Sequence, residues 1–417
     1  MGRDRVRVVS SAVAVLATAA LLAGCGGGSQ TATLNYYVFS EPSGSFAQAV
    51  SDCSKASGGR YKIVYNLLPQ DANAQRQQLV RRLAAHDSAI DIIGMDVDWT
   101  AEFATAGWIR PWTGAQQQQV TQGVLPGPIA TATWNNQIYG APLNSNTQLL
   151  WYRKDLVPKP PTTWTEMIQD AEQLARQGKP HYIEEQGAQY EGYVVWFNSL
   201  VGSAGGQILN GNKVALGPPA QQAATIIYRL ANSPAADPSL SNSKEDQARL
   251  AFEGGKAAFE INYPFVWPSA QKDAPKIAQV MGYAAFPRVL PSMPARVSIG
   301  GINLGISSYS KNPSLAFQAA ACMANPQHQK VNAIKGGLPP TLASLYDDPS
   351  LAKPYPFHAL IKQQLTSYGI RPQTPAYSDV SLAIQKTLSP PASISPATAV
   401  ATLTSQINAS LTSGALL

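Results

Sequence analysis

Acidic side chains stand directly after two predicted strands in the N-terminal part of the chain. Glu41 follows the apolar run 33–39, and Asp96 and Asp98 follow the apolar run 89–95. A carboxylate in such a position accepts hydrogen bonds from the hydroxyls of a polar ligand, and a hydrogen bond to a charged group contributes about 1.5–3 kcal/mol. The three side chains are therefore candidates for ligand contacts.

Aromatic residues sit beside polar ones at several predicted strand and helix ends. The four places are Asp98-Trp99, Glu191-Gly192-Tyr193, Trp196-Phe197-Asn198 and Asn262-Tyr263. Sugars present apolar C–H faces together with many hydroxyls, so a saccharide site needs aromatic rings next to carboxylates, amides and arginines. This pattern favours a sugar ligand, although most aromatic residues of a chain this size belong to its core.

Other chemistries find no support in the sequence. Gly254-Gly255-Lys256 lacks the upstream glycine and the Ser/Thr of a nucleotide-binding P-loop, and Gly202–Gly206 lacks the spacing of a nucleophile elbow. The four histidines are scattered, with neither a CxxC nor an HExxH motif, so we expect no metal and no cofactor. A net charge of +6 over 417 residues is too small for a nucleic-acid partner.

The elements that would position these residues alternate along the chain. Strands are expected at 33–39, 61–67, 89–95, 138–143, 149–152, 257–262 and 297–306, and helices at 46–56, 73–85, 165–177, 194–204, 219–231, 243–252 and 315–323. A last helix places Ala399, Leu403, Ile407 and Leu411 on one face, and Pro264 fits the first turn of another. Alternating strands and helices predict open, mostly parallel sheets, whose ligands bind beyond the carboxyl ends of the strands.

The N-terminus has the features of a lipoprotein export signal. Arginines precede the uncharged run 8–22, which is shorter than the roughly 20 residues of a membrane-spanning helix, and Leu22-Ala23-Gly24-Cys25 follows. We expect residues 1–24 to be removed, Cys25 to be lipidated, and residues 25–33 to tether the body to the extracytoplasmic face of the cell membrane. Of the three cysteines, Cys53 and Cys322 then remain, and a disulfide is the expected state in an oxidising compartment, with two separate buried thiols as the alternative.

A set of local motifs carries a family resemblance. They occupy residues 96–103 (DVDWTAEF), 125–128 (LPGP), 146–153 (NTQLLWYR), 195–198 (VWFN), 300–304 (GGINL) and 371–375 (RPQTP). On these motifs the chain resembles the extracytoplasmic sugar-binding proteins of ABC transporters, in particular the lipoproteins of mycobacterial trehalose importers. The resemblance implies a monomeric, non-catalytic receptor that closes two α/β lobes on trehalose or a close disaccharide and docks on permease subunits served by a cytoplasmic ATPase.

The resemblance also implies a fold and a site. The fold is α/β and two-lobed, of the type II periplasmic-binding-protein kind, with residues 34–145 and 290–336 in the N-terminal lobe and 146–289 and 337–417 in the C-terminal lobe. The implied ligand contacts are Asp96, Asn146, Glu245, Tyr263 and Arg371, followed by Glu41, Trp99, Gly301 and Asn303. Two departures from the family pattern are Tyr263, where a tryptophan is expected, and a short segment between Phe265 and Tyr283. Asp246 beside Glu245 leaves the register there open by one residue.

Each of the five main contacts has a structural alternative. Asp96 fits a helix N-cap and Glu245 an exposed charge at a helix start. Asn146 fits a residue that satisfies backbone groups, Tyr263 a core residue, and Arg371 a solvated loop arginine. At the level of function, Asp96 and Glu245 also suit the paired carboxylates of a lipid-anchored glycoside hydrolase. A structural or adhesive lipoprotein is the third possibility.

Overall fold

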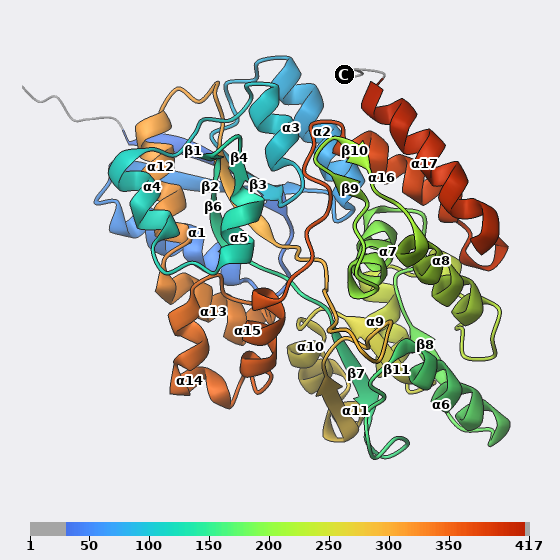
Figure 1. Cartoon of the computed structure of the whole chain (residues 1–417). Helices are drawn as coiled ribbons and strands as arrows, with labels where there is room; N and C mark the ends of the chain where they lie inside the picture. The colour runs from blue at the N-terminus through green and yellow to red at the C-terminus, as the bar shows by residue number, and fades with distance from the viewer. Residues whose placement is uncertain (1–30, 413–417) are drawn as a thin grey trace, which may run out of the picture.

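The computed structural model describes residues 31–412. The predicted export signal, Cys25 and most of the tether therefore lie outside the described residues. Within 31–412 no helix combines the length and the apolar character that crossing a membrane requires. The described chain forms two α/β lobes, each built around its own sheet (Figure 1).

The first sheet has five strands in the order β2-β1-β3-β13-β6. The strands are β1 (Ala32–Phe39), β2 (Tyr61–Leu68), β3 (Ile92–Asp96), β6 (Gly140–Asn144) and β13 (Ile302–Ile306). The helices of this part are α1 (Ser45–Ala56), α2 (Ala72–Ala84), α3 (Thr100–Thr105), α4 (Gly114–Thr121), α5 (Pro126–Ala132), α12 (Pro313–Met323) and α13 (Pro326–Gly336), with a short hairpin of β4 (Thr133–Trp134) and β5 (Gln137–Ile138).

The second sheet has four strands in the order β12-β7-β11-β8. The strands are β7 (Leu149–Arg153), β8 (Tyr182–Glu184), β11 (Ala257–Asn262) and β12 (Met281–Ala284). The other elements of this lobe are α6 (Trp164–Arg176), α7 (Glu191–Ser203), α8 (Pro218–Ala231), α9 (Glu245–Glu253), α10 (Val266–Asp273), α11 (Pro275–Val280), α16 (Tyr377–Leu388) and α17 (Pro396–Thr412), with a hairpin of β9 (Leu209–Asn210) and β10 (Lys213–Val214).

Sequence periodicity accounts for the opening elements. In α1 the buried side chains of Phe46, Ala49, Val50 and Cys53 recur at helical spacing, and in β2 buried Tyr61 and Ile63 flank exposed Lys62. The predicted disulfide is confirmed: Cys53 of α1 is bonded to Cys322 of α12. On α17, Ala399, Leu403 and Ile407 are buried along one face, as predicted.

The sheets are mixed rather than mostly parallel, which corrects that part of the prediction. β1 pairs in parallel with β2 and β3, but β13 returns from the second lobe and runs antiparallel to both β3 and β6. In the second sheet β7 is antiparallel to β11 and β12, and only β8 runs parallel to β11. Because β13 follows a segment that crosses back from the second lobe, it enters the first sheet from the end opposite to that at which β1 and β3 begin.

Three extended segments cross between the lobes and touch one another. The backbones of Asn146 and Gly300 exchange two hydrogen bonds of 2.9 Å. Ile299 N–H donates to the Gly369 carbonyl at 2.9 Å, and Gly369 N–H donates to Val297 at 2.7 Å. The predicted strand 297–306 is thus shortened, because residues 297–300 pair with the other crossing segments and only 302–306 join a sheet.

Two further details differ from the sequence prediction. Pro264 stands before α10 and not in its first turn, because that helix begins at Val266. The helices α14 (Pro349–Ala352) and α15 (His358–Thr366) were not predicted from the sequence, and α14 contacts α13 beside the first sheet. The Phe357 ring packs 5.2 Å from that of Trp151 in the second sheet, while α15 contacts α5 beside the first. The lobe boundary predicted at residue 337 stays a prediction.

Candidate functional site

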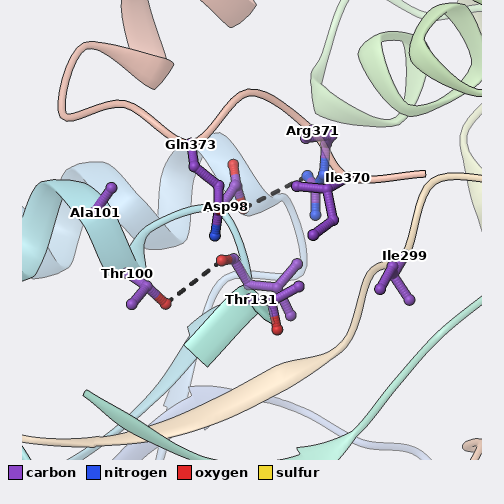
Figure 2. Close-up of a pocket in the computed structure, with 9 residues that line it drawn as sticks. Asp98, Thr100, Ala101, Thr131, Ile299, Ile370, Arg371 and Gln373 are labelled. Carbon is purple, nitrogen blue, oxygen red and sulfur yellow. Dashed lines mark hydrogen bonds and ion pairs between the residues drawn. The ribbon is translucent and has the colours of Figure 1, made fainter. Parts of the chain in front are cut away.

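Arg371 is the centre of a buried ionic cluster where the crossing segments meet the first sheet. Its guanidinium donates to Asp96 Oδ1 and to Glu191 Oε1, both at 2.7 Å, and lies 3.5 Å from Asp98 Oδ1. The Arg371 side chain is 3% exposed, so the alternative of a solvated loop arginine is wrong. Figure 2 shows the ion pair of Asp98 and Arg371, both of which line a small cavity.

The three carboxylates come from different elements. Asp96 ends β3, Asp98 lies in the loop that follows, and Glu191 is the first residue of α7 in the other lobe. Glu191 is itself fixed, since it accepts hydrogen bonds from the hydroxyls of Tyr377 and Ser381 on α16. Arg371 thereby ties β3 of the first lobe to α7 and α16 of the second.

Three carboxyl groups around one guanidinium cannot all stay ionised in a buried site. Burial, together with the charges of Asp96 and Glu191, raises the pKa of Asp98 well above its ordinary value, although Arg371 opposes this shift. Burial also acts to raise the pKa of Asp96, but Arg371 and a hydrogen bond with Asp98 outweigh it and lower the pKa. These shifts favour the charged form of Asp96, which pairs with Arg371, and the neutral form of Asp98.

The opposite wall carries Tyr263 and Glu245. Tyr263 follows β11, and Glu245 is the first residue of α9; both are half-buried. Burial raises the pKa of Tyr263, with further contributions from Glu245 and Asp96, while Arg371 lowers it. The charges of Glu245, Asp96 and Arg371 thus all act on Tyr263. Burial likewise raises the pKa of Glu245.

Asn146 and Gly301 form part of the crossing itself. The side-chain carbonyl of Asn146 accepts a hydrogen bond from Asn144 at 2.9 Å, and its backbone pairs with Gly300, so it does satisfy backbone groups. Gly301 has φ +123°, and a Cβ there would approach the Asn144 carbonyl oxygen to 2.2 Å. Only glycine fits this close approach of two crossing segments.

The remaining predicted contacts are engaged in local structure. Glu41 accepts from the backbone N–H groups of Ser43 and Ser45, both at 2.8 Å, and so holds the start of α1. Trp99 is 3% exposed and stacks on Phe103 in the core. Asn303 is 1% exposed on β13. Trp99 precedes α3 as its N-cap residue, so Asp96 is not the cap of that helix.

Several buried polar atoms near these residues have no hydrogen-bond partner among the described residues. They are Asp98 Oδ1, Arg371 Nε and Glu185 Oε2. An unpaired buried polar atom costs about 1–3 kcal/mol, so such atoms mark a place where an additional hydroxyl-bearing group would be stabilised. The cavity beside Arg371 measures about 10 Å³, which is room for one water and too little for a sugar.

Sequence reasoning missed three of these residues as site candidates. Glu191 was noted only as a polar neighbour of an aromatic, and its partner Arg371 is 180 residues away. Tyr190 precedes α7, and Glu185, which is fully buried, follows β8. Acidic residues are almost always exposed, so the sequence around Glu185 and Glu191 does not indicate that these two are buried.

A pair of buried acids lies deeper in the second sheet. Glu184 on β8 and Glu260 on β11 are neighbours in register, and each is 1% exposed. Burial, with the charges of Asp237 and Glu260, raises the pKa of Glu184 to about 9. Burial raises that of Glu260 to about 8, although the amide of Asn262 lowers it by donating a hydrogen bond.

This pair is expected to make the protein less stable as the pH rises. Between the ordinary glutamate pKa and pH 8 to 9 the folded chain holds more protons than the unfolded chain. The stabilisation is complete below the ordinary glutamate pKa, declines as the pH rises, and is fully lost once the pH exceeds the folded-state values of about 8 and 9. Against a Glu184→Gln/Glu260→Gln variant, urea unfolding of the wild type should lose about 1.4 kcal/mol per pH unit and group between pH 6 and 7.5. Parallel pH profiles of the two proteins would contradict this protonation.

One group of potential metal ligands comes together among residues 31–412. Cys53, Cys322 and His328 have ligand atoms within 4.8 Å of one another. Both sulfurs are consumed by the disulfide, so this group offers a metal only one imidazole. The arrangement gives no reason to assign a metal site.

The family of the chain follows from its similarity to known proteins. A profile of the bacterial extracellular solute-binding proteins matches residues 28–330, well over half of the chain. The chain belongs to this family. A "Probable ABC transporter-binding protein" of Deinococcus radiodurans is 28% identical over 337 residues, which cover 77% of this chain and 78% of the relative.

Solved structures of solute-binding proteins show the same fold. The maltose-bound MalE3 of T. maritima has a TM-score of 0.84 at 24% identity, covering 90% of this chain and 99% of that one. The GacH receptor of Streptomyces glaucescens, solved unliganded and with acarbose, has a TM-score of 0.80 at 21% identity, covering 91% and 98%. The two-lobed α/β solute-binding fold is thereby confirmed.

Proposed function

We propose that this solute-binding protein captures trehalose, or a close disaccharide analogue, and delivers it to an ABC importer. The observation that carries the proposal is the pair of polar walls on facing lobes. Asp96 and Arg371 form one and Tyr263 and Glu245 the other, and Asp98 Oδ1 and Arg371 Nε have no hydrogen-bond partner among residues 31–412. A ring of donors and acceptors with one aromatic face suits a sugar.

The solved relatives support a sugar ligand. Neighbouring structures were solved with maltose, tagatose or acarbose bound. Trehalose itself is supported by the motifs around Asp96, Asn146 and Arg371, which resemble the trehalose-binding lipoproteins. A disaccharide fills more than the present cavity, so binding requires the lobes to open and close again around it.

The remaining parts of the proposal follow from the N-terminal sequence and the family. Cys25 is lipidated and anchors a monomer to the extracytoplasmic face of the membrane, and permease subunits receive the sugar there. An extracytoplasmic place agrees with a disulfide between Cys53 and Cys322.

Calorimetric titration with trehalose tests the ligand. We expect a dissociation constant in the micromolar range, which corresponds to about −8 kcal/mol, and weaker binding of maltose. Protein whose fold is verified by circular dichroism and that gives no heat with trehalose would exclude this ligand, and heat with another disaccharide would redirect the proposal.

The glycoside hydrolase alternative has a separate test. The family consists of solute-binding proteins, and Asp96 is occupied by its ion pair with Arg371, so we expect no hydrolysis. Glucose should stay undetectable after long incubation of the protein with trehalose. Glucose release that disappears in Asp96→Asn would establish the hydrolase instead.

A further inference from the structure

The first turn of α2 touches the second lobe at two separate points. Asp71, the N-cap of α2, accepts a hydrogen bond from Lys244 Nζ at 2.6 Å, and Asn73 donates to Gln385 of α16 at 3.4 Å. α2 connects β2 with β3 of the first sheet, whereas Lys244 precedes α9, which packs on β11 and β8 of the second. Both contacts therefore bridge the lobes, and Figure 1 shows α2 beside α16.

The Asp71–Lys244 pair lies closer to solvent than the Arg371 cluster. The two side chains are 29% and 40% exposed, in contrast to the buried Arg371 cluster. The carboxylate of Asp71 serves both lobes, since Oδ1 caps α2 by accepting from Ala74 N–H at 3.0 Å and Oδ2 binds Lys244. The cap holds the carboxylate in place for the ion pair.

Lys244 is also joined to the site behind it. Its Nζ lies 4.9 Å from the centre of the Tyr190 ring, a cation–π contact, and the next residue in the chain is Glu245. The Tyr190 hydroxyl interacts with Glu245. The position of Lys244 is thus coupled to Tyr190 and Glu245.

The second contact continues as a chain of hydrogen bonds to the centre of the site. Gln385 donates to Ser381 Oγ at 2.8 Å, and Ser381 donates to Glu191 at 2.5 Å. Glu191 accepts from Arg371, which reaches Asp96 in the first lobe. The Asn73–Gln385 contact and the Arg371–Asp96 pair are therefore the two ends of one polar network, which starts and finishes in the first lobe.

We propose that Lys244 and Gln385 bind the first turn of α2 as a latch that holds the lobes closed and lengthens the residence time of the bound sugar. The inference rests on the proposed function for its effect on the sugar. Lys244 and Asp71 act as positioning residues that close the lobes. A half-exposed ion pair contributes up to about 1 kcal/mol, so its loss should speed trehalose dissociation about fivefold.

Stopped-flow fluorescence and spin-label distances test the latch together. The variants are Lys244→Met and Asp71→Asn, the second of which keeps the helix cap, and the double variant of both. Each single change should raise the trehalose dissociation rate about fivefold and leave the association rate and melting temperature nearly unchanged. The double variant should be no faster than either single one. Lys362→Met is the matched control and should behave as wild type. It removes a 2.8 Å ion pair with Asp347, which joins α15 to the neighbouring turn and not to the other lobe.

The distance measurement needs no ligand and so separates the latch from the proposed function. Spin labels on Gln118→Cys in α4 and Gln173→Cys in α6, both exposed, report on the lobes in the chain with Cys25→Ser. Without sugar, Lys244→Met should shift the distances to longer values, and 1 M salt should shift the wild type in the same direction. Unchanged distances in Lys244→Met and Asp71→Asn would overturn the latch, even if trehalose binds. Failure of trehalose to bind the wild type would overturn the ligand and leave the distance result as the test of the latch.

Discussion

Replacing Arg371 with alanine is expected to weaken trehalose binding at least tenfold and to lower the free energy of unfolding by about 3–5 kcal/mol. The guanidinium is buried and contacts Asp96, Asp98 and Glu191, so its removal leaves carboxyl groups from both lobes without their cation. Calorimetry measures the first effect and urea unfolding at pH 7 the second.

Two further variants separate binding from folding. Arg371→Lys keeps the charge but cannot reach Asp96 and Glu191 with two parallel donors, so it should lose affinity with a smaller loss of stability. Arg176→Ala, at an exposed position on α6, should change neither quantity by more than about 0.5 kcal/mol. An Arg371→Lys protein with the affinity of wild type would remove this residue from the site.

Loss of the disulfide is the second large effect. Cys53 and Cys322 are 269 residues apart in the chain, so their bond strongly restricts the unfolded state, and we expect Cys53→Ala/Cys322→Ala to lose about 2–4 kcal/mol of unfolding free energy. The bond joins α1 to α12, and Arg371 and Tyr263 lie elsewhere in the fold. Trehalose affinity of the folded variant should therefore stay within twofold of wild type.

Reduction provides the matched control for this prediction. A dithiol reductant should lower the unfolding midpoint of wild-type protein in urea and leave that of the Cys53→Ala/Cys322→Ala variant unchanged. Equal unfolding free energies of wild type and variant, measured without reductant, would show that the bond does not stabilise the protein.

Local patterns were sufficient to predict the beginning of the fold. The alternation in Tyr61–Leu67 and the helical spacing of Phe46, Ala49 and Val50 depend only on near neighbours, and both elements form where expected. The pairing of Cys53 with Cys322 was predictable because the predicted lipidation of Cys25 leaves only two cysteines. These conclusions need no knowledge of the tertiary structure.

The electrostatics of the site depend on contacts that no local pattern contains. Arg371 was identified by its motif, but its partner Glu191 comes from the distant helix α7, and the raised pKa of Asp98 arises only where three carboxyls meet. The antiparallel entry of β13 likewise depends on the path of the crossing segments. Such long-range pairings are set by the tertiary fold, so spacing along the chain cannot reveal them.

A crystal structure of the protein grown with trehalose tests the central claim most directly. The account predicts one disaccharide between the two sheets, with hydroxyls bonded to Asp96, Arg371 and Glu245 and a sugar ring against Tyr263. It also predicts that the hydrogen-bond partners missing from Asp98 Oδ1 and Arg371 Nε are supplied by the sugar or by waters bound to it. A structure with trehalose bound outside the Arg371 cluster, or with the cluster unchanged and no sugar between the lobes at saturating concentration, would contradict the account.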